Sequence, residues 1–300
     1  MSESVFHSSL SVPVSGGNLH VGVAGAPLGS APVVLAVHGI TGSHVSFLPV
    51  VRHLGDAVSV LAPDLRGRGQ SAGLPGPHGM AVHVDDLLNV LTHAGVHRAI
   101  LAGHSMGAYV VTRLAAAHPA CAAAVVMIDG GLPLSVPAGV DPDELVDAVL
   151  GPAIKRLSME FASAEAYRDF WRAHPSFAVP GAWTEDVVAY VDYDLVGDPP
   201  AMRSRVEEAA VRFDGRDLLD VEATWDALKA LACPVVLVRA PLGLLNEPNP
   251  LIPDQIVAEA GAVLPGMVDV LVPETNHYLI AMGPREARTV ADQISAAAGV

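Results

Sequence analysis

The sequence predicts an α/β protein in which a mostly parallel sheet is flanked by helices and interrupted by a helical insertion. Three observations indicate this fold. Short apolar runs alternate with helical patterns, about a hundred residues between two of the runs show no strand pattern, and 300 residues suffice for a large core. Hydrophobic residues make up 51% of the chain and charged residues 16%, which excludes a disordered protein.

Six short apolar runs bounded by turn residues predict the strands. Continuous apolar runs of this length are typical of strands buried on both faces, as in a parallel sheet. The runs cover residues 33–37, 57–62, 99–102, 123–128, 235–238 and 268–272. The residues up to about 25 alternate more loosely between polar and apolar, which predicts antiparallel strands at an edge of the sheet.

Helical patterns lie between and after these runs. They cover residues 82–94, 105–117, 253–260 and 284–298. The repeated alternation of strand and helix favours right-handed crossovers, which place the helices against the faces of the sheet.

The segment between the fourth and fifth runs predicts a helical cap over one end of the sheet. We therefore divide the chain into a first core part, residues 1–130, the cap, residues 131–232, and a second core part, residues 233–300. Helical patterns broken by proline occur near residues 141–150, 163–173, 184–190 and 202–210. Aromatic residues gather in the cap, where they form either its own core or the roof of an apolar pocket. The pocket residues that we expect are Leu132, Phe161, Trp183 and Tyr190.

The charge balance and the cysteines narrow the kinds of partner. Lys and Arg number 17 and Asp and Glu number 32, which gives a net charge of −15 and argues against nucleic acid or an anionic membrane. No apolar stretch approaches the ~18 residues of a membrane span and no signal peptide is visible, so we expect a cytoplasmic protein. Cys121 and Cys233 match neither a disulfide framework nor a zinc pattern, which indicates small buried hydrophobic residues.

The pentapeptide Gly103-His104-Ser105-Met106-Gly107 predicts a catalytic nucleophile. It fits Gly-x-Ser-x-Gly and stands directly between an apolar run and a helical pattern. A sharp turn from strand to helix exposes the serine hydroxyl at the carboxyl end of the sheet, where open α/β sheets bind ligands. In another context Ser105 would be an ordinary helix N-cap.

The loop that begins His38-Gly39-Ile40 predicts part of an oxyanion hole. Acyl transfer needs two donors aimed at the oxygen that becomes negative. The backbone N–H of Met106 is one candidate, and the N–H of Ile40 is the other. Gly39 lets the backbone approach closely, and we expect His38 to support the loop by hydrogen bonds.

These motifs together resemble the α/β-hydrolase fold of serine hydrolases. The resemblance includes the His38-Gly39 loop, the Ser105 elbow, His277 and the run Asp64-Leu65-Arg66-Gly67-Arg68-Gly69-Gln70-Ser71, and it spans the chain outside the cap. It implies a catalytic triad in the order serine, acid, histidine. The run after Asp64 is a family marker whose charged side chains are expected to tie the loop together.

The resemblance assigns the histidine and leaves two candidates for the acid. His277 follows the last apolar run, although Asn276 stands where the family usually has glycine. The family's usual aspartate after the cap is missing, with Glu247 nearby. We favour Asp129, because a strand end fixes a carboxylate better beside the imidazole, and keep Glu247 as the alternative.

The resemblance implies a hydrolase that works through an acyl-serine intermediate without a metal or cofactor. The expected substrate is a small-to-medium apolar carboxylic ester or lactone. A carbon–carbon bond hydrolase and a non-catalytic, receptor-like ligand binder are the alternatives, because fold alone does not fix function. The sequence leaves the oligomeric state open, a homodimer included.

Overall fold

The computed structural model describes residues 5–136 and 139–300 and contains the expected sheet. Its strand order is β1-β2-β4-β3-β5-β6-β9-β10, with β1 and β2 antiparallel at one edge and the strands from β4 to β10 parallel. The predicted α/β fold is confirmed. The strands are β1 (Phe6–Val14), β2 (Gly17–Gly25), β3 (Val33–Val37), β4 (Ser59–Pro63), β5 (Ala99–His104), β6 (Ala122–Ile128), β9 (Val235–Arg239) and β10 (Val268–Leu271).

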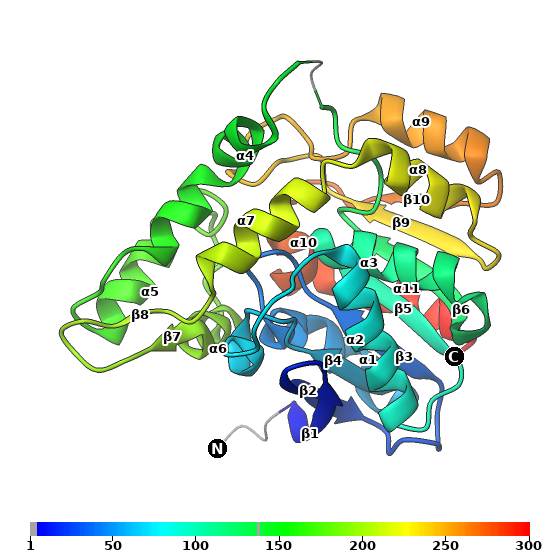
Figure 1. Ribbon diagram of the computed structural model, residues 1–300, viewed down its shortest axis with the longest axis horizontal. Coiled ribbons are helices and arrows are strands. Elements are labelled where there is room, and N and C mark those ends of the chain that lie inside the picture. Colours follow the sequence, from blue (N-terminus) through cyan, green and yellow to red (C-terminus); the bar gives the residue numbers. More distant parts are fainter. Residues whose placement is uncertain (1–4, 137–138) are drawn as a thin grey trace.

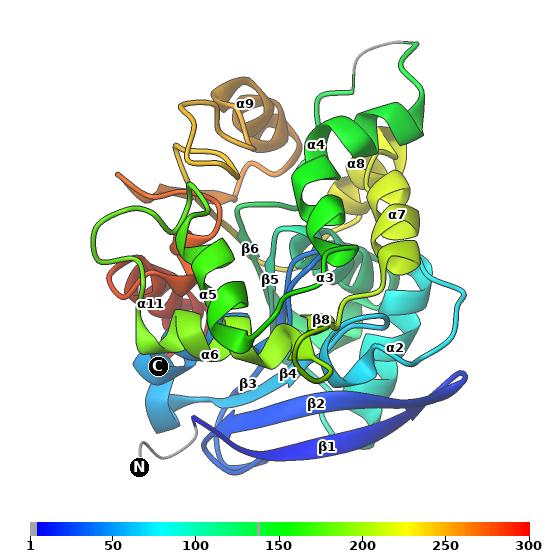
Figure 2. The same cartoon turned by 90° about the vertical axis from the view of Figure 1, so that its left-hand side faces the viewer.

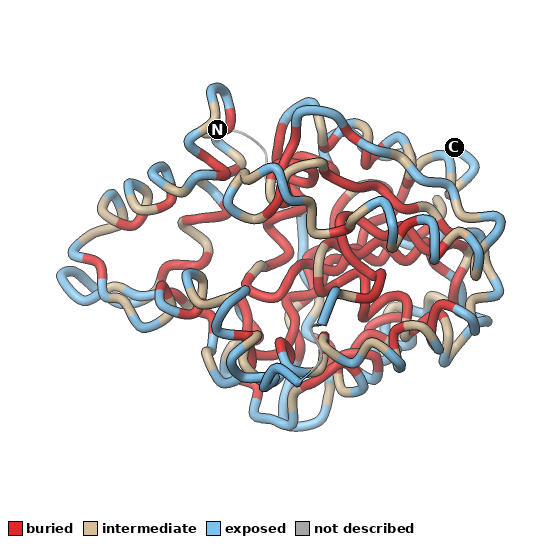
Figure 3. The backbone as a smooth tube through the Cα atoms, turned by 90° about the horizontal axis from the view of Figure 1, so that it is seen from above, coloured by how far each residue is buried: buried red, intermediate tan, exposed pale blue. Residues whose placement is uncertain are grey.

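Helices cover both faces of the sheet (Figure 1). Because side chains alternate along a strand, Leu35 faces one core and its neighbours Val34 and Ala36 face the other. Against the first face pack α2 (Met80–His93), α3 (Met106–Ala117), α8 (Val221–Lys229) and α9 (Asp254–Val263), and against the second α1 (Leu48–Leu54), α10 (Leu279–Met282) and α11 (Glu286–Ala298). The buried residues accordingly concentrate in the interior of the molecule (Figure 3).

One strand departs from the expectation that every apolar run is buried on both faces. β10 lies at the end of the sheet and pairs with β9. Val268 and Leu271 are 50% and 48% exposed. The sequence alone does not show which apolar strand will lie at an edge of the sheet. The prediction that this strand is buried on both faces is therefore wrong.

The insertion between β6 and β9 stands beside one end of the sheet (Figures 1 and 2). Asp141, Ser163 and Thr184 cap three of its helices with side-chain oxygens that accept backbone N–H groups. These helices and the next are α4 (Pro142–Leu157), α5 (Ala164–Arg172), α6 (Glu185–Asp194) and α7 (Glu208–Asp217).

The insertion is not entirely helical. A short antiparallel pair, β7 (Leu195–Val196) and β8 (Arg203–Ser204), interrupts it, so the helix expected near residues 202–210 begins only at Glu208. The Ser204 hydroxyl donates to the Asp194 carboxylate at 2.8 Å, which draws this stretch back toward α6. α8 lies within the range predicted for the cap but packs on α3 beside the sheet.

Short 3₁₀ segments complete the described chain: η1 (His44–Phe47), η2 (Gly55–Ala57), η3 (Gly69–Ser71) and η4 (Pro119–Cys121). Within the described ranges, no helix combines the length and the apolar composition that a membrane crossing requires.

Candidate active site

Ser105 occupies the tight turn between β5 and α3. Its backbone has φ 53° and ψ −123°, a conformation that is strained for a residue with a side chain. A Cβ at Gly103 would lie 2.2 Å from the carbonyl oxygen of Gly107, and one at Gly107 would lie 2.0 Å from that of Val37. Both glycines are therefore required for this turn, which presents Ser105 to the pocket above the sheet.

His277 and Asp129 form a buried pair beside this turn. His277 Nδ1 donates to Asp129 Oδ2 at 2.7 Å, and the other carboxylate oxygen accepts the backbone N–H of Ala240 at 3.0 Å. Both residues are buried, at 3% and 0% exposure. Since Asp129 binds Nδ1, the ring nitrogen that remains for a proton from serine is Nε2.

The alternative acid, Glu247, lies in a different arrangement. Its carboxylate accepts the N–H of Leu245 at 2.7 Å, and its carbonyl accepts the N–H of Gly243 at 2.9 Å. Glu247 thus closes its own loop, while Asp129 is the carboxylate that the structure places on His277.

Asn276, which departs from the family pattern, has a defined structural role. Its side-chain oxygen accepts the N–H groups of Tyr278 and Leu279 at the start of α10. Its amide nitrogen donates to the carbonyl of Ser176 and to the side-chain oxygen of Asn246. The residue before His277 therefore ties the histidine loop to the insertion, which glycine could not do.

The first candidate oxyanion loop lies against the nucleophile. A Cβ at Gly39 would come within 3.1 Å of the Ser105 Cβ, and Ile40 follows directly. His38 Nδ1 donates to the Gly39 carbonyl at 2.7 Å, and His38 Nε2 accepts the N–H of Leu65 at 2.9 Å. Burial lowers the pKa of His38 to about 4, so the ring is neutral and supports the loop.

The second candidate donor is the N–H of Met106 at the start of α3. It is one of the first N–H groups of the helix, which have no partner within the helix. Behind it, His104 Nε2 donates to the His277 carbonyl at 2.8 Å. Burial and nearby His277 lower the pKa of His104 to about 3, so this link between the two loops is also uncharged near neutral pH.

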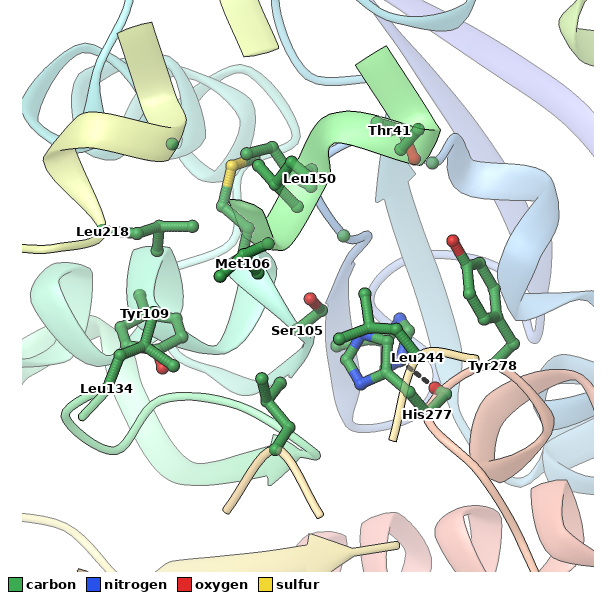
Figure 4. Close-up of a pocket in the computed structure, with 18 of the residues that line it drawn as sticks. Thr41, Ser105, Met106, Tyr109, Leu134, Leu150, Leu218, Leu244, His277 and Tyr278 are labelled. Atoms are coloured by element: carbon green, nitrogen blue, oxygen red, sulfur yellow. Dashed lines mark hydrogen bonds between the residues drawn. The ribbon is translucent and has the colours of Figure 1, made fainter. Parts of the chain in front are cut away.

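A pocket opens above Ser105, and its walls are mostly aliphatic (Figure 4). Ser105 and His277 both line it, together with Ile40 and Met106. Its remaining apolar walls come chiefly from α4 and from the segments around α7, β9 and α10. These lining residues are Leu134, Leu145, Val146, Val149, Leu150, Ala153, Leu218, Leu219, Leu244, Leu251, Tyr278 and Met282.

Of the four pocket residues expected from the sequence, Tyr190 lines the pocket and the other three do not. Leu132 is buried in the core, and its carbonyl accepts the Tyr109 hydroxyl at 2.6 Å. Phe161 and Trp183 belong to the insertion's own packing: Phe161 meets Tyr167 edge to face, and Trp183 lies under the Arg172 guanidinium. Composition cannot distinguish these roles, because cores and pockets use the same residue types.

The roof that sequence reasoning missed is α4. Its lining residues Leu145, Val149 and Ala153 recur every four positions, with Val146 and Leu150 beside them. Such a stripe marks one face of a helix. Val149 is 46% exposed, which is unusual for the apolar face of a helix that only packs on a core. The apolar stripe itself, which the sequence of α4 shows, is the signal that could have located the pocket.

One group of side chains in the described part of the chain has the residue types of a metal site. His20, His44 and Asp64 can each offer an atom within 4.8 Å of the others. However, Asp64 already accepts from His44 Nδ1 and the His44 N–H at one oxygen, and from the Gln70 N–H and the Tyr193 hydroxyl at the other. These bonds identify Asp64 as the anchor of its loop.

Comparison with known proteins places the chain in a family. A family model described as alpha/beta hydrolase fold matches residues 32–204. RutD of Klebsiella pneumoniae (strain 342), a proposed carbamate hydrolase, is 26% identical over 270 residues, which cover 86% of this chain and 89% of the relative. The 2-(acetamidomethylene)succinate hydrolase of Mesorhizobium japonicum is 26% identical over 260 residues, which cover 85% of each chain.

Solved structures show the same fold. The crystal structure of E-2-(acetamidomethylene)succinate hydrolase aligns with a TM-score of 0.79 at 23% identity, covering 96% of this chain and 98% of the other. The thioesterase domain from the curacin biosynthetic pathway aligns at 0.74 and 20% identity, with the same coverage. The chain belongs to the alpha/beta-hydrolase fold family. It is a hydrolase of that family.

Proposed function

We propose that this hydrolase cleaves a small-to-medium apolar carboxylic ester or lactone through an acyl-serine intermediate. The observation that carries the proposal is the placement of Ser105 on a strained turn in an apolar pocket that His277 also lines, with Asp129 bonded to His277 behind it. Nucleophile, base and orienting carboxylate are the three parts that acyl transfer requires.

The geometry supports a two-step reaction. Ser105 Oγ bonds to the substrate carbonyl carbon while its proton passes to His277 Nε2, and the N–H groups of Ile40 and Met106 stabilise the oxyanion. The carbon–oxygen ester bond then breaks, and His277 returns the proton to the leaving alkoxide. A water molecule next gives a proton to His277 and attacks the acyl carbon. The bond between the acyl carbon and Ser105 Oγ then breaks, and His277 returns the proton to Oγ, which releases the carboxylic acid and restores Ser105.

The pocket walls support a neutral substrate. Among the residues that line the pocket in the described part of the chain, none is lysine or arginine. A carboxylate on the substrate near the scissile bond would lose its water without gaining a cation, which is unfavourable. The pocket therefore differs from what a succinate derivative, the compound named for two of the similar proteins, would require.

Hydrolysis of p-nitrophenyl esters over a series of acyl chain lengths tests the proposal. We expect turnover with a preference for apolar acyl chains and a fall of about 10⁴-fold or more in kcat for Ser105→Ala. Turnover that survives this substitution would exclude Ser105 as the nucleophile. No turnover of any ester would instead favour a carbon–carbon bond hydrolase or a non-catalytic ligand binder.

A further inference from the structure

We propose that Asp214, on α7 of the insertion, positions the oxyanion-binding N–H of Ile40 through Arg68. This inference rests on the proposed acyl-serine reaction and assigns a residue outside the pocket to it. Asp214 does not line the pocket, and 146 positions separate it from Arg68 in the sequence.

The two peptide planes on either side of Ile40 are each held by a buried side chain. His38 donates to the Gly39 carbonyl at 2.7 Å, and Arg68 Nε donates to the Ile40 carbonyl at 2.8 Å. In a trans peptide the C=O and N–H groups point in opposite directions. The first bond therefore fixes the direction of the Ile40 N–H. The second bond fixes the next peptide plane, which contains the Ile40 carbonyl.

Arg68 is held in turn by the insertion. Its guanidinium is fully buried, and Nη1 donates to Asp214 Oδ2 at 2.5 Å and to the Arg66 carbonyl at 2.8 Å. Asp214 Oδ2 also accepts His83 Nε2 at 2.9 Å, and Asp214 Oδ1 accepts the Gly79 N–H at 2.7 Å. The carboxylate is thus the point at which α7 joins the loop that supports Ile40.

Asparagine cannot replace this carboxylate. Both oxygens of Asp214 accept, so an amide group in either orientation turns its NH₂ toward a donor, either the Gly79 N–H or the Arg68 guanidinium. Arg68 then loses its buried counter-charge and shifts away from its present position. Its bond to the Ile40 carbonyl is released, so the peptide plane after Ile40 is no longer fixed, and the Ile40 N–H is held from one side only, by the His38 bond to Gly39.

A second buried pair in the same loop provides a matched control. Arg66 pairs with Asp86 through two hydrogen bonds, and both side chains are almost as deeply buried as those of Arg68 and Asp214. The other side-chain bonds of Arg66 go to the carbonyls of Ser15 and Pro75, and its backbone carbonyl accepts Arg68 Nη1. Asp86→Asn therefore removes a comparable ion pair whose side chains make no bond to Ile40 or Asp214.

The test compares Asp214→Asn with Asp86→Asn on the preferred p-nitrophenyl ester. We expect Asp214→Asn to lower kcat by about 10- to 100-fold with little change in KM, because the oxyanion donor acts mainly in the transition state. The affinity for phenylboronic acid, whose serine adduct places an oxygen in the oxyanion hole, should fall in parallel. Asp86→Asn should lose comparable thermal stability and keep its kcat.

A second variant tests the inference if Asp214→Asn fails to fold. Arg68→Lys keeps a cation for Asp214, but a lysine lacks the planar fork that reaches Asp214 and the Ile40 carbonyl together, so it should also lower kcat. Equal kcat in wild type, Arg68→Lys and Asp214→Asn, or an equal loss in Asp86→Asn, would overturn the inference alone. A wild type inactive on every ester would overturn the proposed function, and the inference with it.

Discussion

Two residues of the candidate site have strained backbones and lie against each other. Ser105 has φ 53° and Asp129 has φ 44°, and a Cβ at Gly130 would lie 2.3 Å from the Ser105 carbonyl. Such conformations cost about 1–3 kcal/mol each and persist only where the surroundings impose them. Here the Ser105 N–H donates to the Ile128 carbonyl and the Asp129 N–H to the Val238 carbonyl, so the sheet itself holds both residues.

The choice of the triad acid can be tested at the same scale. We expect Asp129→Asn to lower kcat by about 10⁴-fold, because an amide holds His277 in the wrong tautomer and does not stabilise its cation. Glu247→Gln should leave kcat close to that of wild type, since Glu247 bonds to its own loop. An intact Asp129→Asn enzyme together with an inactive Glu247→Gln enzyme would reverse the assignment.

The sequence predicts the Ser105 turn directly but leaves the partner of His277 open, and the reason is physical. The Ser105 turn is local, because the glycines that make it possible lie two residues away on either side. The pairing of His277 with Asp129 spans 148 positions and depends on which strands become neighbours. Sequence could therefore name both acids, but only the arrangement of β6 beside β9 brings one of them to the histidine.

At the scale of elements, α4 forms one wall of the pocket, and we expect the acyl chain of a substrate to lie against it. Leu150 lies in the pocket wall (Figure 4). Ala148 on the same helix is exposed and does not line the pocket. We expect Leu150→Trp to shorten the preferred acyl chain and to lower kcat/KM for the longest ester by about tenfold or more.

Ala148→Trp is the matched control for this prediction. It adds the same ring to the same helix outside the pocket, so the chain-length profile should stay that of wild type. An unchanged profile in Leu150→Trp would show that the acyl group binds elsewhere.

The insertion shows why elements are easier to predict than their roles. Its helices have local signals, such as the caps Ser163 and Thr184. The aromatic residues of α5 and α6 pack largely on one another, with Trp171 in contact with Tyr167 and Tyr190. Which apolar face meets the pocket is decided by the docking of the insertion on the core, which local sequence does not contain.

At the scale of the whole molecule, the loops above the sheet bury ionisable groups whose charge depends on folding. Burial lowers the pKa of His38 from 6.5 to about 4, and burial with nearby His277 lowers that of His104 from 6.5 to about 3. Burial alone would raise the pKa of Asp64 and Asp214, but His44 lowers that of Asp64, and Arg68 with His83 lowers that of Asp214, below its ordinary value.

We therefore expect the free energy of unfolding to fall as the pH drops below about 6.5. From there down to pH 4, the unfolded chain binds protons on His38 and His104 that the folded chain does not, so stability rises with pH over this window. Each histidine contributes at most about 1.4 kcal/mol per pH unit. Below pH 4 the two aspartates lose stability in the same direction. Urea unfolding at pH 7, 6, 5 and 4.5 measures the slope.

A substitution at His104 separates its contribution from the rest. His104→Gln has no titrating ring, and its amide can still donate to the His277 carbonyl, so the pH slope should be shallower by about one proton. His7→Gln, at an exposed position in β1, should keep the wild-type slope. If the free energy of unfolding stays flat from pH 7 to 4.5 in the wild type, folding does not hold the two buried rings neutral, and the supporting role of His38 and His104 must be reassigned.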